Sequence, residues 1–300
     1  MTLDAGGTNF VFSAMRANRT AVNAFALPAS GDDLPVSLNT LVEGFERVRA
    51  ELDAAPAAIS FAFPAPADYF NGIIVSPRNL PAYRDVPLAA FLEDRFQVPV
   101  FINNDGDLFT YGEAASGFLP YVNALLEAAG SPKRFRNLIG ITLGTGFGGG
   151  IVRDGELFAG DNSVAGELWL LRHKNREDWN IEEGASIRAV RRRYSEVSGL
   201  EAPEPKVIAE VAAGRRDGDR GAAIEAFRLM GEIAGDGVAT ACTILDGLVA
   251  VGGGISAAHS LFLPALVDEM KKRGIDIARR TVAKYRDQLN IPTARLRKKF

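Results

Sequence analysis

The first 120 residues alternate between two hydrophobic periods. Apolar side chains at every second position predict strands, and apolar side chains at helical spacing predict amphipathic helices. Two short runs of apolar residues predict buried strands. In chain order we expect strands at residues 1–5, 9–17 and 21–27, a helix at 38–52, strands at 57–63 and 98–102, and a helix through 108–115.

The second half repeats this plan. We expect strands at residues 137–143, 151–153 and 156–158, helices at 186–197, 206–213 and 219–245, a strand at 248–251, and a helix from Ala257. Strand, glycine turn, strand, turn and strand thus occur twice, each time ahead of further α/β material. This duplication predicts two lobes with a cleft between them, residues 1–117 and 118–270, with the boundary in the glycine- and proline-containing stretch 117–136.

The composition is that of a globular protein with a sizeable core. The 300 residues are 47% hydrophobic and 24% charged, and this length gives a soft prior of roughly two domains. No stretch approaches the ~20 apolar residues of a membrane span, and the charged, glycine-containing start is unlike a secretory signal. The single cysteine, Cys242, excludes an internal disulfide and a cysteine-based zinc site. We therefore expect a cytoplasmic protein with no membrane partner.

The charge is distributed unevenly. Residues 271–300 hold eleven basic and two acidic side chains, whereas residues 1–270 hold 23 basic and 35 acidic ones. A basic end on an acidic body suggests a polyanionic partner, although a solvated helix end would carry charge in the same way. We treat residues 271–300 as a separate basic tail.

Residues 144–149, Gly-Thr-Gly-Phe-Gly-Gly, satisfy the pattern G-x-G-x-x-G. A dinucleotide fold needs a helix to start at this loop, but here the chain continues as a strand towards a turn at Asp154-Gly155. We therefore expect a glycine hairpin whose backbone N–H groups approach phosphate oxygens. A tight hairpin without a ligand is the alternative, and three glycine sites in one chain, at 6–7, 144–150 and 252–254, argue against it.

Six ordered segments carry a specific resemblance. They are Leu3-Asp4-Ala5-Gly6-Gly7-Thr8-Asn9, Ser76-Pro77-Arg78-Asn79-Leu80-Pro81, Asn104-Asp105 with Gly112-Glu113, Thr142 to Gly150, Ala165-Gly166-Glu167, and Val251-Gly252-Gly253-Gly254. Together they resemble the ROK family of sugar kinases and related repressors, within the actin, hexokinase and heat-shock ATPase superfamily. The resemblance covers residues 2–260. It implies an α/β fold of the two-lobed, actin-like ATPase type, a ribonuclease H-like duplication with a central interlobe cleft.

The resemblance also implies an ATP-dependent carbohydrate kinase. Asp105 would be the general base that accepts the proton of the attacking hydroxyl. An Asn-Asp pair after a strand is otherwise typical of a helix N-cap, and Asp107 could take that role and leave Asp105 available. Side chains with fixed planar donors or acceptors would hold the other hydroxyls of a hexose: Asn79, Asn104, Glu167 and Glu182. For Glu182 a solvent-facing acid is the alternative.

The same resemblance implies ATP and Mg²⁺ as cofactors. Asp4 would orient Mg²⁺ through water, although a polar residue at a strand end is the alternative. The nucleotide-binding positions would be Asp4, Gly6, Gly7, Thr8, Thr142, Gly144, Thr145, Gly146, Gly252, Gly253 and Gly254. A homodimer is compatible with this assignment.

The sequence departs from the family near Glu167. Many members carry a histidine three residues after this glutamate, and a cysteine cluster that binds zinc. Here Leu170 stands at the histidine position, His173 has a different spacing, and no cysteine cluster follows. No zinc is expected, because too few suitable ligands exist. The missing histidine leaves the identity of the sugar open.

The basic tail carries a second resemblance. Residues 277–286 are similar to the DNA-reading end of enhancer-dependent bacterial sigma factors, which implies a helix-turn-helix recognition segment. Its first helix would come from residues 262–273, with a turn at Gly274, and its DNA contacts would be Arg279, Arg280, Lys284 and Arg286. A sugar-responsive DNA-binding regulator is therefore the alternative function. In the family's repressor branch the helix-turn-helix precedes the kinase body, which is the reverse of the order here.

Overall fold

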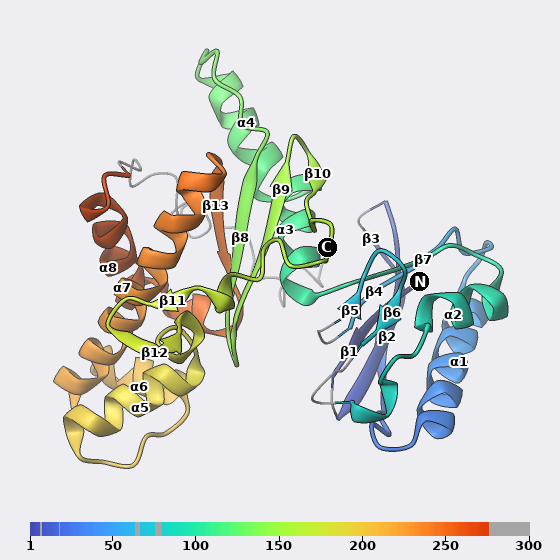
Figure 1. Ribbon diagram of the computed structural model, residues 1–300, viewed down its shortest axis with the longest axis horizontal. Coiled ribbons are helices and arrows are strands. Elements are labelled where there is room, and N and C mark those ends of the chain that lie inside the picture. Colours follow the sequence, from blue (N-terminus) through green and yellow to red (C-terminus); the bar gives the residue numbers. More distant parts are fainter. Residues whose placement is uncertain (7, 18, 64–66, 76–79, 276–300) are drawn as a thin grey trace. The chain divides into compact units, whose positions relative to one another are not determined.

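The structure is a computed structural model that describes residues 1–6, 8–17, 19–63, 67–75 and 80–275 (Figure 1). The described chain divides into two compact units, with one division between Leu108 and Phe109. The first unit comprises residues 1–108 with 160–163, and the second comprises residues 109–159 with 164–275. Each unit has its own sheet and its own hydrophobic core.

The first unit is built on a five-stranded sheet in the order β3-β2-β1-β4-β7. The strands are β1 (Thr2–Ala5), β2 (Asn9–Arg16), β3 (Arg19–Pro28), β4 (Ile59–Ala62) and β7 (Val100–Asn103). β1 is antiparallel to β2 and parallel to β4, and β4 is parallel to β7. A small hairpin, β5 (Ala67–Asp68) and β6 (Ile73–Ile74), and a short 3-10 helix, η1 (Pro81–Tyr83), complete the unit together with its helices.

Two helices pack on this sheet, α1 (Leu34–Glu51) and α2 (Leu88–Phe96) (Figure 1). Asp33 caps α1, because its carboxylate accepts a hydrogen bond from the N–H of Val36. Apolar residues at helical spacing then bury one face of α1, and Phe45 on that face is fully buried.

The second unit has a four-stranded sheet in the order β10-β9-β8-β13. Its strands are β8 (Leu138–Leu143), β9 (Phe147–Arg153), β10 (Glu156–Leu157) and β13 (Leu248–Gly252). β8 is antiparallel to β9 and parallel to β13, as β1 is to β2 and β4 in the first unit. The predicted duplication of strand, glycine turn, strand, turn and strand is therefore confirmed.

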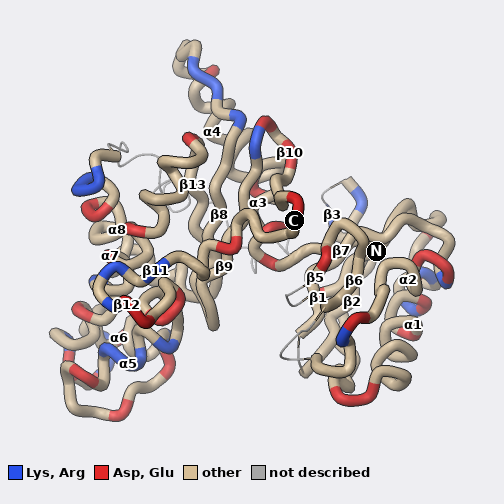
Figure 2. The backbone as a smooth tube through the Cα atoms, viewed as in Figure 1, with Lys and Arg blue, Asp and Glu red and all other residues tan. Residues whose placement is uncertain are grey.

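The strands β8 and β13 of the second unit are buried on both faces, as expected when helices cover both sides of a sheet. Ile139 and Ile141 of β8 join the core formed with α5 to α8, whereas Leu138 joins the core formed with α3 and α4. The helices are α3 (Asp105–Ala115), α4 (Phe118–Ala128), α5 (Ile187–Ser198), α6 (Pro205–Ala212), α7 (Arg220–Ile244) and α8 (His259–Lys272). Basic and acidic residues both occur along α5 and α6 (Figure 2).

Shorter elements connect these helices and strands. They are the 3-10 helices η2 (Leu168–Leu170), η3 (Ile181–Glu183) and η4 (Gly254–Ala258), and the two-stranded sheet of β11 (Arg172–His173) and β12 (Arg176–Asn180). Cys242 lies on α7, where it is partly buried against the core. No described helix has the length and hydrophobicity needed to cross a membrane.

The stretch 117–136, in which the sequence places the boundary between the lobes, lies within the second unit. It contains α4, which begins after Gly117 and ends before Gly130. Gly117 precedes the helix, Pro120 lies in its first turn, where a backbone N–H has no intrahelical acceptor, and Gly130 and Pro132 follow the helix.

Candidate active site

Asp105 lies where β7 of the first unit gives way to α3. Its side chain is exposed, and its Oδ1 accepts the N–H of Gly106 at 2.9 Å. The helix cap is Asn104, whose Oδ1 accepts the N–H of Asp107 at 2.6 Å and whose carbonyl accepts the N–H of Leu108 at 3.1 Å. The expectation that Asp107 could cap the helix is wrong, because Asp107 is buried inside the first turn and Asn104 takes that role. Asp105 is thus an exposed carboxylate at a rigid strand-to-helix junction.

The first glycine turn joins β1 to β2. Gly6 donates its N–H to the carbonyl of Asn9 at 3.0 Å, and a Cβ at Gly6 would lie only 3.0 Å from that same oxygen. Asp4 and Thr8 on either side of the turn are exposed. The carboxylate of Asp4 has no hydrogen-bond partner among the described residues, so it is available for a water-bound cation.

The second glycine turn joins β8 to β9 at the Gly144–Phe147 hairpin. Leu143 pairs with Phe147, and Gly144 donates its N–H to the carbonyl of Gly146 at 3.1 Å. Within the described parts of the chain, the N–H groups of Thr145 and Gly146 have no acceptor. The prediction of a hairpin instead of a dinucleotide-binding helix is confirmed, and its tip offers backbone donors of the kind that bind anions.

The third glycine site lies beside this hairpin. Gly252 of β13 pairs with Thr142 of β8. Gly253 has a φ of +86°, and a Cβ there would lie 2.3 Å from the carbonyl oxygen of Leu143. The fold therefore brings Thr142, the hairpin and residues 252–254 together at one end of the second sheet, and glycine is required at 253 because the backbones approach so closely.

Glu167 precedes η2 on a segment that packs against β9. A Cβ at Gly166, which has a φ of +89°, would lie 2.9 Å from the Cα of Gly150. The indole N–H of Trp169 donates to Oε2 of Glu167. This hydrogen bond orients the Glu167 carboxylate, and no sequence pattern indicated Trp169 as its partner.

Glu182 lies on η3, close to the hairpin. Its Oε2 accepts the N–H of Phe147 at 3.1 Å, and its Oε1 accepts a hydrogen bond from Nη2 of Arg188 at 3.0 Å. The alternative of a merely solvent-facing acid does not describe Glu182, because its side chain is only 24% exposed and bonds to the hairpin backbone. Hydrogen bonds from Arg188 lower the pKa of the neighbouring Glu183 carboxyl. Sequence reasoning missed Arg188, because four arginines lie between positions 188 and 193 and nothing distinguishes them.

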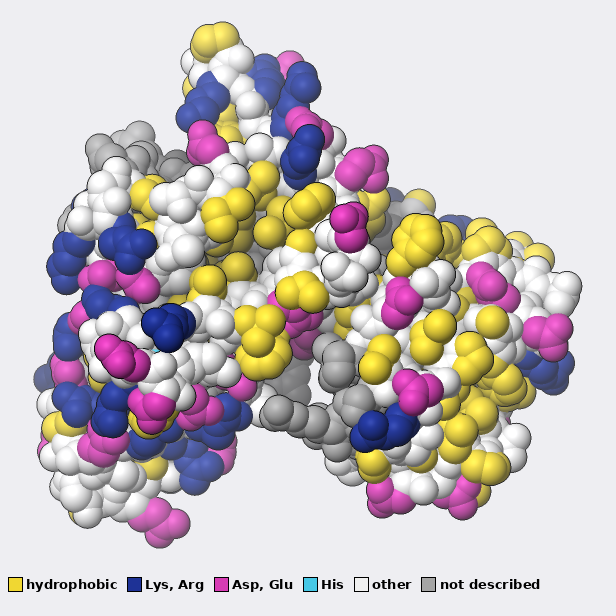
Figure 3. Space-filling model, viewed as in Figure 1, with side chains coloured by type: hydrophobic (Ala, Val, Ile, Leu, Met, Phe, Trp, Pro, Cys, Tyr) yellow, Lys and Arg dark blue, Asp and Glu magenta, His cyan; other side chains and the backbone are white. Residues whose placement is uncertain are grey.

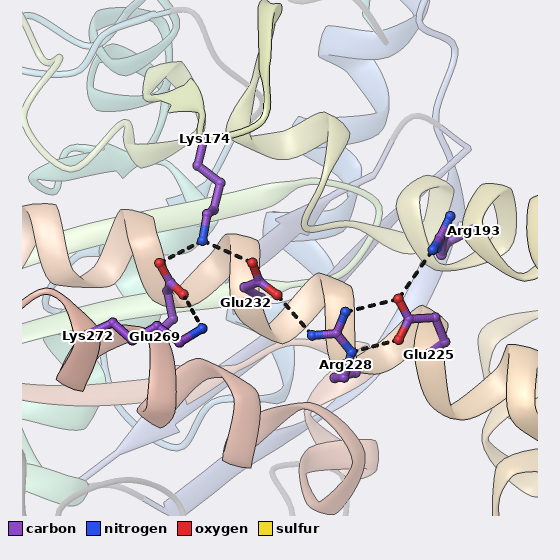
Figure 4. A network of polar contacts seen from close by, with 7 residues as sticks. All are labelled: Lys174, Arg193, Glu225, Arg228, Glu232, Glu269 and Lys272. Atoms are coloured by element: carbon purple, nitrogen blue, oxygen red, sulfur yellow. Dashed lines mark hydrogen bonds and ion pairs between the residues drawn. The ribbon is translucent and has the colours of Figure 1, made fainter.

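The chain that leads into Glu182 is fixed by a network of charged side chains (Figure 4). Lys174, between β11 and β12, donates to Glu232 of α7 at 3.0 Å and to Glu269 of α8 at 2.7 Å. The Glu269 side chain is only 6% exposed. The network continues through Lys272, Arg228, Glu225 and Arg193. It ties the β11–β12 hairpin, which directly precedes η3, to α5, α7 and α8.

An aromatic cluster supports the same hairpin. His173 meets Trp179 edge-to-face at 5.6 Å, and the guanidinium of Arg192 lies 4.1 Å from the Trp179 ring centre. Burial lowers the pKa of His173, and the charges of Arg192 and Arg176 lower it further. His173 is therefore a packing residue of this segment.

Some predicted residues lie outside the described part of the chain: Gly7, Asn79, Arg279, Arg280, Lys284 and Arg286. Of residues 262–273, expected as the first helix of a helix-turn-helix, residues 262–272 belong to α8 and Arg273 is its C-cap. Phe262, Leu266 and Met270 are buried in the core with α7. DNA binding by the tail thus stays a prediction from the sequence.

A cavity of about 520 Å³ lies in the first unit, at the carboxyl ends of α1 and α2. Its lining includes Arg49, Leu52, Phe96 and Val98, and no predicted site residue. The candidate site residues are therefore the glycine turns and acidic side chains described above for each unit by itself.

The repeated order of strands, together with the glycine turns, defines the α/β fold of the actin-like ATPases. The family model described as "ROK family" matches residues 1–290, so this chain belongs to the ROK family. A crystal structure of a glucokinase from Parabacteroides distasonis is 54% identical, with a TM-score of 0.88, over 91% of this chain and 77% of that one.

Two further similar proteins are an N-acetyl-D-glucosamine kinase and a second glucokinase. The N-acetyl-D-glucosamine kinase of Vibrio vulnificus (strain YJ016) is 32% identical over 169 residues, which are 56% of this chain and 51% of that protein. The chain thus matches about half the length of this curated relative. A ROK family glucokinase from Streptomyces griseus, solved with glucose and AMPPNP, shares the fold at 23% identity and a TM-score of 0.68, over 94% of this chain and 93% of that one.

Proposed function

We propose that this protein transfers the γ-phosphoryl group of ATP to a hydroxyl of a hexose, with glucose as the first candidate. The observation that carries the proposal is the Gly144–Phe147 hairpin, with its two available N–H donors, in a chain of the ROK family. The 54% identity to a protein described as a glucokinase supports glucose, and the likeness to an N-acetyl-D-glucosamine kinase makes that sugar the second candidate.

In this proposal Asp105 accepts the proton of the attacking hydroxyl. An exposed carboxylate at the end of a strand is accessible to a substrate and is held by a rigid element. The hydrogen bond from the N–H of Gly106 fixes Oδ1 of Asp105. The orientation of the carboxylate, and with it the position of Oδ2, is thereby limited. Phosphoryl transfer depends mainly on such positioning.

The phosphates of ATP would lie against the N–H groups of Thr145 and Gly146, with Gly252–Gly254 beside them. Glycines allow this approach because no Cβ stands in the way, and a Cβ at Gly144 or Gly254 would meet open space. Mg²⁺ would be held through water by Asp4, whose exposed oxygen ligands suit a hard cation. When bound, the ion would neutralise charge on the phosphate oxygens.

The remaining hydroxyls of the hexose would be held by Asn79, Asn104, Glu167 and Glu182. The Glu167 carboxylate accepts a hydrogen bond from the indole N–H of Trp169, and the Glu182 carboxylate accepts from the N–H of Phe147 and from Arg188, so both carboxylates have a defined orientation. An oriented carboxylate can still accept a hydrogen bond from a sugar hydroxyl, because each of its oxygens has two lone pairs.

The proposal is tested by turnover. Purified protein is incubated with Mg-ATP and a hexose panel that includes glucose, mannose and N-acetylglucosamine, and ADP release is followed. We expect turnover on at least one sugar, and a fall of at least about 100-fold in kcat for Asp105→Asn, the lower range for losing a general base.

A matched control keeps this result interpretable. Asp53→Asn removes an exposed aspartate whose partner is Arg16, remote in sequence from the glycine turns. We expect this variant to turn over like the wild type. Absence of ADP release with every sugar, from protein that binds AMPPNP and melts cooperatively, would remove the kinase proposal.

A further inference from the structure

The Gly144–Phe147 hairpin is held at three points by the segment that contains η3 and the start of α5. The N–H of Ile187 donates to the carbonyl of Gly144 at 2.8 Å. Glu182 accepts the N–H of Phe147 at 3.1 Å, and Nη1 of Arg188 lies 3.5 Å from the carbonyl oxygen of Thr145. All these residues belong to the second unit.

Arg188 is the centre of this arrangement. Its Nη2 donates to Oε1 of Glu182 at 3.0 Å and to Oε1 of Glu183 at 2.9 Å. One guanidinium thus bridges two adjacent carboxylates while its other nitrogen is turned to the hairpin. A planar guanidinium can do this because its donors point in fixed directions, whereas an ammonium cannot.

Glu182 is packed flush against the hairpin backbone. A Cβ at Gly146 would lie 2.4 Å from Oε2 of Glu182, so the carboxylate occupies the space that a side chain at 146 would need. Without the arginine, the carboxylates of Glu182 and Glu183 would repel each other next to this backbone. The orientation of Glu182 and the shape of the hairpin therefore depend on the same cation.

We propose that Arg188 is a positioning residue that couples Glu182 to the Gly144–Phe147 hairpin. The inference rests on the proposed function, in which Glu182 contacts the sugar and the hairpin contacts the phosphates. Arg188 then sets both contacts together, although it touches neither ligand. Loss of Arg188 is expected to lower the affinities for the sugar and for the nucleotide by a similar factor.

The first test compares Arg188→Gln with Arg191→Gln by isothermal titration with AMPPNP and with glucose. Arg191 lies on the same helix and is 43% exposed against 49% for Arg188, but its partners are the Ala202 carbonyl and Glu204. For Arg188→Gln we expect both affinities to fall about tenfold, the lower range for charge-assisted hydrogen bonds at a half-exposed site. Arg191→Gln, the control, should change each of the two affinities by less than about twofold. A loss confined to one ligand, or an equal loss in the control, would overturn the inference.

The conservative variant separates geometry from charge. Arg188→Lys keeps the positive charge but cannot bridge both carboxylates and face the hairpin. We expect it to recover less than half of the lost binding free energy. Full recovery by lysine would show that the charge alone matters, which contradicts a positioning role.

A ligand-free measurement separates failure of this inference from failure of the proposed function. Hydrogen exchange of a peptide spanning the hairpin is compared between wild type, Arg188→Gln and Arg191→Gln. We expect about tenfold faster exchange only in Arg188→Gln, because Glu182 no longer protects the Phe147 N–H. If the wild type turns over no sugar but this difference appears, the proposed function fails and the coupling stands. If turnover is present and the exchange rates are equal, the coupling fails.

Discussion

The two units share an order of strands but stabilise it with different side chains. In the first unit, Phe12 contacts Phe25 and Phe45, with ring centres 5.7 and 5.3 Å apart, and Phe45 also meets Phe61 and Phe96. Gly44 makes room for this cluster, since a Cβ there would lie 2.2 Å from the Phe12 ring. Large aromatic rings thus fill the space between this sheet and α1.

In the second unit, helices approach one another closely. A Cβ at Gly231 or Gly235 of α7 would lie 2.1 or 2.5 Å from a backbone carbonyl of α8. The edges of this packing are joined by the charged network of Lys174, and side chains of opposite sign lie next to one another over this unit (Figure 3). The same order of strands is therefore compatible with aromatic packing in one unit and with close helices and ion pairs in the other. What the two units share is the pairing of their strands, not the composition of their cores.

The largest loss of stability should come from a substitution in the aromatic cluster of the first unit. Phe45→Ala leaves a cavity among rings that cannot collapse, and we expect a loss of about 3–5 kcal/mol of unfolding free energy. Urea unfolding measures this loss, and hydrogen exchange should locate it in the first unit. Phe45→Leu, which keeps most of the volume, should lose far less. Equal losses for the two variants would mean that the cluster is not tightly packed.

A smaller effect is expected from the charged network. Glu269→Gln leaves Lys174 and Lys272 without a carboxylate between them, and we expect a loss of about 1–2 kcal/mol. Burial alone would raise the pKa of Glu269, but hydrogen bonds from Lys174 and Lys272 outweigh it and lower that pKa. The contribution of this carboxylate is thus present at neutral pH and is lost as the pH falls through its lowered folded-state pKa.

Thermal melts of wild type and Glu269→Gln at pH 7 and pH 3 test this assignment. The difference between the two proteins should shrink at the lower pH, where the wild-type carboxylate gains a proton. Arg16→Gln, at a fully exposed ion pair, should match the wild type at both pH values. A difference that does not change with pH would show that Glu269 acts by packing alone.

The smallest effect concerns His173. Its folded-state pKa is lowered from 6.5 by burial and by Arg192 and Arg176, so the unfolded chain binds the proton more readily. The contribution of neutral His173 to the free energy of unfolding is fully present above pH 6.5 and declines as the pH falls below that value. Melts between pH 7.5 and 5.5 should show a steeper decline for the wild type than for His173→Gln, whereas parallel curves would contradict the assignment.

The periodicity of the sequence predicted most of the fold. The strand β8 and the glycine hairpin after it were predictable, because a short apolar run leads into the glycines and a further turn follows at Asp154-Gly155. The sheet of β11 and β12 was not predictable, since β12 is Arg-Glu-Asp-Trp-Asn and has no apolar alternation. Its stability comes from tertiary contacts of Lys174 and Trp179, which local patterns do not encode.

The site was predictable only where a motif fixed the chemistry. Asp105 and the glycines were named from their order along the chain, but the structure was needed to find that Asn104 is the cap. Likewise, nothing in the spacing of the arginines of α5 indicated which one faces the hairpin, because the rotation of a helix about its axis is set by what it packs against.

Cys242 is the one cysteine of the sequence and is partly buried, which has a practical consequence for labelling. Burial, together with the nearby charge of Asp246, raises the pKa of its thiol to about 11, so little thiolate exists at neutral pH and maleimides react with it slowly. As the sequence contains one cysteine, a second thiol installed at exposed Thr145 would be modified far faster. A fluorophore could then be attached to the hairpin tip of the otherwise unaltered chain.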